Sequence, residues 1–120
     1  MNTTFEKARA FMYRNARPLD LARFQYHFEN GSKEAVLNIL SYYQNEDGGF
    51  GHAVEADCWN PNSIPLHSNT ASEIIREIDV MDSQQPVIQG LLKWYESGKH
   101  FNGKSWEITV ESNNDYPHAP

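Results

Sequence analysis

Four side chains able to bind a metal ion or transfer a proton lie close together in the middle of the chain: His52, Glu55, Asp57 and Cys58. Imidazole, carboxylate and thiolate groups are the usual ligands of zinc. Asp57 and Cys58 are adjacent, however, and neighbouring side chains of an extended segment point to opposite sides. We therefore predict no metal site and no cofactor, with zinc or magnesium as an unsupported alternative.

Glu55 and Asp57 are the candidates for catalysis. Two carboxyl groups can act as acid and base if an apolar pocket raises the pKa of one of them. The alternative is that both are solvated acids of a loop. The residues alone leave open whether the protein is an enzyme.

A second set of candidates consists of aromatic and imidazole rings outside the apolar helix faces. They lie in two regions, residues 52–67 and 106–118, where any ligand is expected to bind if both regions surround one cavity. The alternative is that the rings cover the edges of helix pairs. The candidate ligand-binding residues are His52, Trp59, His67, Trp106, Tyr116 and His118.

Five segments have the apolar spacing of amphipathic helices. They start at Thr3, Pro18, Ser32, about Ser68 and about Pro86. Strand-like alternation is confined to residues 106–110. The sequence predicts one all-α domain over residues 1–120, built of antiparallel helical hairpins, with long loops at 45–66 and 98–120 that are functional or packed.

The apolar residues also predict which helix faces are buried. In the second helix the expected stripe is Leu21, Phe24 and Phe28, and the helix is expected to stop at residues 30–31, Asn-Gly. In the fifth helix the expected stripe is Ile88, Leu91, Leu92 and Tyr95.

The most unusual stretch is YYQNEDGGFGH, residues 42–52. A phosphate-binding P-loop would need a lysine after its last glycine, and none follows here. The structural interpretation is that Gly48 and Gly49 allow positive φ just past a helix end. Asp47 then accepts backbone N–H groups in a turn, Gln44 binds backbone groups at a neighbouring helix end, and Phe50 is an apolar plug.

An apolar helix followed by this stretch resembles the repeat of the prenyltransferase and squalene-cyclase (terpenoid cyclase) superfamily. The matching residues are Gln44, Asp47, Gly48, Gly49, Phe50 and Gly51. The resemblance implies an α/α toroid with a central cavity that binds or processes a terpenoid or another small molecule. The acid motif Asp-x-Asp-Asp of terpene cyclases is absent, and so is the Asp-x-Cys metal motif. A carbohydrate-active toroid and a non-enzymatic helical binding or scaffold module are the alternatives.

Five helices form only about half of such a ring. We therefore expect a partial toroid, which is a fragment or short form that lacks a C-terminal half or forms a homo-oligomer to cover its apolar faces.

Composition narrows the class of partner. The net charge of −6 argues against nucleic acid, which requires clustered lysine and arginine. Cys58 is the only cysteine, so an internal disulfide is excluded. No apolar run is long enough to span a membrane. We expect a cytoplasmic protein with a small-molecule ligand.

Overall fold

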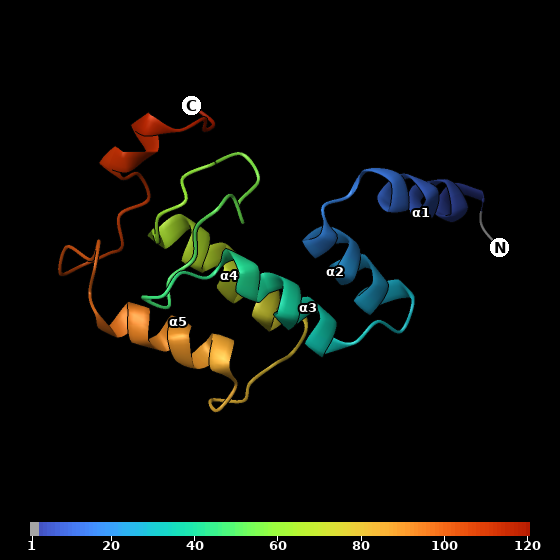
Figure 1. Ribbon diagram of the computed structural model, residues 1–120, viewed down its shortest axis with the longest axis horizontal. Coiled ribbons are helices and arrows are strands. Elements are labelled where there is room, and N and C mark those ends of the chain that lie inside the picture. The colour runs from blue at the N-terminus through green and yellow to red at the C-terminus, as the bar shows by residue number, and fades with distance from the viewer. Residues whose placement is uncertain (1–2) are drawn as a thin grey trace. The chain divides into compact units, whose positions relative to one another are not determined.

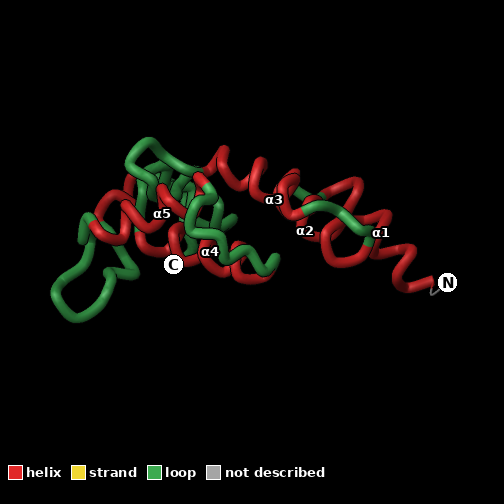
Figure 2. The backbone as a smooth tube through the Cα atoms, turned by 90° about the horizontal axis from the view of Figure 1, so that it is seen from below, coloured by secondary structure: helices red, strands yellow, loops and turns green. Residues whose placement is uncertain are grey.

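The computed structural model describes residues 3–120, and over that range the chain is helical, as the sequence predicts (Figures 1 and 2). No strand occurs between residues 3 and 120, and no helix there is long and apolar enough to cross a membrane. Two short 3-10 helices, η1 (Ser41–Tyr43) and η2 (Glu111–Asp115), accompany five α-helices. The α-helices are α1 (Thr3–Asn15), α2 (Pro18–Phe28), α3 (Lys33–Leu40), α4 (Pro65–Glu77) and α5 (Pro86–Glu96).

Proline sets the start of three of these helices. α2, α4 and α5 each begin with it, at the position where a missing N–H group costs no helical hydrogen bond. For α4 this corrects the prediction, because the helix begins at Pro65 and not near Ser68. His67, expected in a loop region, therefore lies in the first turn of α4.

The chain divides into two compact units between Ile39 and Leu40, and each is described by itself. In the first unit, the ring of Phe5 in α1 packs on Phe24 and Phe28 of α2, with centroids 6.0 and 5.7 Å apart. The predicted stripe of α2 is wrong in part: Leu19 and Ala22 are buried, whereas Phe28 is mostly exposed. Phe28 lies at the end of its helix, where its ring also packs against Phe24, with centroids 5.1 Å apart.

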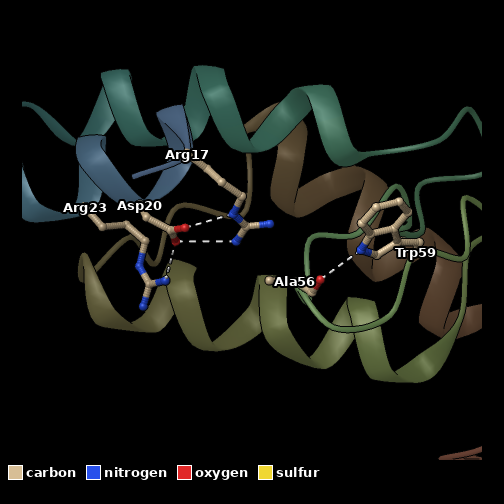
Figure 3. Close-up of polar contacts among 5 residues, drawn as sticks. All are labelled: Arg17, Asp20, Arg23, Ala56 and Trp59. Atoms are coloured by element: carbon tan, nitrogen blue, oxygen red, sulfur yellow. Dashed lines mark hydrogen bonds and ion pairs between the residues drawn. The ribbon is translucent and has the colours of Figure 1, made fainter. Parts of the chain in front are cut away.

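The first turn of α2 carries a small network of charged groups (Figure 3). Asp20 accepts a hydrogen bond from Arg17 at 2.8 Å and pairs with Arg23 at 3.4 Å. A carboxylate in the first turn also interacts favourably with the helix dipole. All three side chains are about one-third exposed, so the ion pairs add little stability.

In the second unit, the glycine-rich stretch forms a tight hairpin-like loop. Gln44 and Phe50 form an isolated antiparallel bridge, and the Gly48 N–H donates to Asn45 O at 2.9 Å. Gly48 has a φ of 89°, as expected of a turn glycine. Gly49 does not adopt positive φ, so the predicted reason for that glycine is wrong.

The reason for these glycines is close approach. A Cβ atom on Gly48 would lie 1.9 Å from the carbonyl oxygen of Gly90, in the middle of α5. One on Gly49 would lie 2.4 Å from Ser63 Cβ, and one on Gly51 would lie 2.1 Å from Pro61 O. The loop backbone therefore touches α5 and the segment before α4 directly.

Two side chains of the loop fix this contact. Gln44 donates through Nε2 to Gly48 O at 2.9 Å and to Val87 O in the first turn of α5 at 3.0 Å. Asp47 accepts from Gly49 N–H at 2.9 Å and from Ser63 Oγ at 2.6 Å. We call the Gln44 amide and the Gly48–Gly90 contact together the glycine clasp.

The clasp explains which face of α5 is buried. Val87, Leu91 and Trp94 are buried, while Leu92, part of the predicted stripe, is half exposed. The inward face is the one that carries Gly90, where a Cβ atom would lie 2.7 Å from Gln44 Nε2 and would displace that hydrogen-bonded amide.

The strand alternation at 106–110 does not produce a strand. Phe101 and Trp106 form one isolated bridge across a turn in which Asn102 N–H donates to Ser105 O at 3.1 Å. The turn nevertheless holds the Trp106 ring against Phe101, with centroids 5.0 Å apart.

Replacing Gly48 by alanine tests the close approach. We expect Gly48→Ala to lower the free energy of unfolding by about 3 kcal/mol or more, because the new methyl group overlaps the α5 backbone. Gly98→Ala is the matched control, since Gly98 also has positive φ, 70°, but a Cβ there would meet nothing within 4 Å. Its expected cost is about 1 kcal/mol. Urea unfolding measures both variants, and equal losses of unfolding free energy in Gly48→Ala and Gly98→Ala would contradict the close approach.

Candidate functional site

Candidate residues from distant parts of the chain surround one hollow of about 430 Å³. Glu55, Asp57 and His118 line it, together with Leu66 and Ile108. Asp57 and His118 lie close because two short segments pair. Ala119 N–H donates to Asp57 O at 2.8 Å, and Trp59 N–H donates to Pro117 O at 2.9 Å.

A second hollow of about 370 Å³ adjoins the first. Tyr95 and Trp106 provide its aromatic wall, and Leu66 and Ile108 line both hollows. Pro65 and Asn69 of α4 complete its lining. We call the two hollows together the Leu66–Ile108 groove, which is aromatic at one end and carries carboxylates at the other.

Glu55 is oriented by α4. Its carboxylate accepts a hydrogen bond from Thr70 Oγ1 at 2.8 Å, and its backbone N–H donates to His67 Nδ1 at 3.3 Å. The side chain is half-buried, whereas Asp57 is exposed. One carboxylate of the groove is therefore held in place, and the other is free to meet solvent or ligand.

Cys58 has a structural environment. The side chain is buried with Ile64 and Val110, and its thiol donates a hydrogen bond to Asn113 Oδ1 at 3.6 Å. The buried Asn60 donates to the same oxygen at 2.9 Å. Between residues 3 and 120, no three histidine, cysteine, aspartate or glutamate side chains form a group that could hold a metal ion.

His67 is buried and lines neither hollow. Desolvation by burial lowers the pKa of its imidazole to about 4; the Asn60 backbone opposes this shift and the charge of His52 adds to it. Nδ1 accepts the Glu55 N–H, so the proton of the neutral ring is on Nε2.

The remaining candidates lie outside the groove lining. His52 is exposed, with Nε2 2.7 Å from Asn45 Oδ1, and lines a separate polar hollow beside Asp47. Trp59 is 60% exposed, and its indole N–H donates to Ala56 O at 3.2 Å (Figure 3). Tyr116 is partly exposed and absent from the lining of either hollow.

Several groove residues were not among the candidates. Tyr95 was expected in the core, but its ring lines the aromatic hollow. Ile108 is 77% exposed, so it is a surface residue that lines the groove and not a core residue. The alternation of Trp106 and Ile108 was the available signal, since residues two apart in an extended segment share one side.

Comparison of the chain with protein-family models, curated proteins and solved structures gives no match.

The low pKa of His67 predicts a pH dependence of stability. The folded-state pKa of about 4 lies below the ordinary histidine pKa of 6.5, so the unfolded chain binds the proton more readily. The free energy of unfolding should have its full value above pH ~6.5 and should fall as the pH drops toward 4. The total decrease should be about 3 kcal/mol. Urea unfolding at several pH values measures this.

Asn is a suitable replacement for this histidine, because its side-chain oxygen can accept the Glu55 N–H and does not titrate. His67→Asn should flatten the curve between pH 6.5 and 4. The matched control His27→Asn, at an exposed histidine of α2, should keep the slope. A slope unchanged by His67→Asn would show that another group causes it.

Proposed function

We propose that the chain binds a small, largely apolar molecule in the Leu66–Ile108 groove, with a neutral or cationic polar group at the Glu55 end. The observation that carries this proposal is the adjacency of an aromatic hollow and a carboxylate-lined hollow that share Leu66 and Ile108. Concave sites of this kind, mostly apolar with a few polar groups, are typical of small-molecule binding.

The aromatic end is supported on several sides. Trp106 stacks on the buried Trp94, with centroids 5.7 Å apart, and meets Tyr95 edge-on at 5.2 Å. The Tyr95 hydroxyl lies 3.3 Å from Ser72 Oγ of α4. Rings already held in position lose little conformational freedom when a ligand binds, which favours affinity.

The other end selects by charge. Among the described residues, no lysine or arginine lines either hollow, while Glu55 and Asp57 line one of them. An anionic group such as a diphosphate would be repelled there without a metal ion or a cation to neutralise it. A hydroxyl or ammonium group can instead bind to the carboxylates.

The resemblance of residues 44–51 to the terpenoid cyclase repeat agrees with an isoprenoid or similar apolar ligand. The partial toroid, the missing half or homo-oligomer and the cytoplasmic location stay predictions. Glu55 and Asp57 stay candidates for proton transfer, and the proposal itself requires binding alone.

Carbohydrate binding is the second candidate. A flat, 60% exposed Trp59 ring with its N–H fixed suits stacking on a sugar, and carboxylates suit sugar hydroxyls. This candidate predicts that Trp59, outside the groove, dominates the affinity.

Calorimetric titration with farnesol, farnesyl diphosphate and a cello-oligosaccharide separates the candidates. We expect the alcohol to bind more tightly than its diphosphate. Ile108→Ser should weaken that binding about fivefold or more, because Ile108 lines both hollows. The matched control is Met81→Ser, an equally exposed apolar residue outside the groove lining, at 83% against 77%.

Two results would overturn the proposal. One is tighter binding of the diphosphate, or no binding of either isoprenoid. The other is binding of the oligosaccharide alone, weakened by Trp59→Ala and not by Ile108→Ser, which would establish the carbohydrate candidate.

A further inference from the structure

The chain contains the dipeptide Asn-Gly twice, at residues 30–31 and 102–103. In such a pair the backbone nitrogen of glycine can attack the side-chain amide of asparagine, since no side chain shields it. The two copies share this sequence but differ in their surroundings, so they form an internal comparison.

At the second copy, the side-chain oxygen of Asn102 is already polarised. Its Oδ1 atom accepts backbone N–H groups from Lys104 at 2.9 Å and from Ser105 at 3.0 Å. This oxygen becomes negative when the amide carbon is attacked. Two backbone donors directed at a developing oxyanion lower the barrier to such a reaction.

The attacking nitrogen is also accessible there. Gly103 has a φ of 94°, and a Cβ atom on it would meet nothing within 4 Å. Within residues 3–120, its N–H takes part in none of the hydrogen bonds of the turn, which use Asn102, Lys104 and Ser105. The nitrogen can approach the side chain without first losing a partner.

The first copy is protected. Gly31 N–H donates to Gln25 O at 2.8 Å, so the attacking nitrogen is engaged with the end of α2. A Cβ on Gly31 would lie only 2.8 Å from the Gln25 carbonyl carbon, which shows how closely the backbone packs. Attack on Asn30 requires this contact to open first.

We propose that Asn102 is a site of spontaneous deamidation and isomerisation in the folded protein, and that Asn30 is protected from both. The Gly103 nitrogen forms a bond to Asn102 Cγ, the Cγ–Nδ2 bond breaks, and ammonia leaves with the proton of Gly103. Water then opens the cyclic imide at either carbonyl, which gives aspartate or an isoaspartyl linkage with one more backbone atom.

The isoaspartyl product would alter the turn that positions Trp106. Phe101 and Trp106 form a bridge directly on either side of the segment 102–105. An extra backbone atom changes the register across this bridge, as a bulge does. If the groove binds its ligand as proposed above, ageing at Asn102 would weaken that binding, but the modification itself does not depend on the proposed function.

Peptide mapping by mass spectrometry after incubation at neutral pH tests the inference. We expect Asn102 to convert about tenfold faster than Asn30 in the folded protein, the factor corresponding to one net hydrogen bond. In urea the two rates should become similar, because the dipeptides are identical. Folded-state rates that are equal, or a ratio that persists in urea, would overturn the proposal.

Asn102→Ser provides the matched variant, because its hydroxyl can accept the turn N–H groups but has no amide to lose. During incubation, tryptophan fluorescence should change in the chain that keeps Asn102 and stay constant in this variant. An equal change in both would show that the fluorescence reports some process other than modification of Asn102.

Discussion

The contact between the backbones of Gly48 and Gly90 is the constraint on which the second unit depends. The loop approaches the middle of the helix so closely because Gly48 lacks a side chain: a Cβ atom there would lie 1.9 Å from Gly90 O. The half-buried Gln44 amide then links the loop to the first turn of α5 through Val87 O. Because the clasp involves the backbone of α5, it fixes the rotation of that helix as well as its position.

The groove follows from this rotation. With Gly90 facing the loop, Trp94 is buried and Tyr95 lies beside Trp106 at the aromatic end. The same loop extends to α4, since Phe50 O accepts the Ile64 N–H at 3.3 Å just before the helix begins. α4 in turn carries Thr70, which orients Glu55. The stretch that contains the glycines is therefore structural, and the groove with its carboxylates lies beyond it.

Local features of the sequence were sufficient to predict that five helices form, although the start of α4 at Pro65 was missed. Prolines 18 and 86 and the N-cap Ser32, whose Oγ accepts Ala35 N–H at 3.0 Å, act within a few residues. The inward face of α5 could not be predicted, because Gly90 acquires its role only when Gly48 meets it from a distant part of the chain. For the same reason, no local pattern could indicate that residues 57–59 pair with 117–119 and bring His118 to Glu55 and Asp57.

Urea unfolding of Gln44→Glu, beside the exposed control Gln89→Glu on α5, tests the central role of the clasp most directly. The substitution replaces a donor to two carbonyl oxygens by a carboxylate that repels them. We predict that Gln44→Glu lowers the free energy of unfolding by about 3 kcal/mol and that the control changes it by less than ~0.5 kcal/mol. Equal, small effects of the two substitutions would contradict the account.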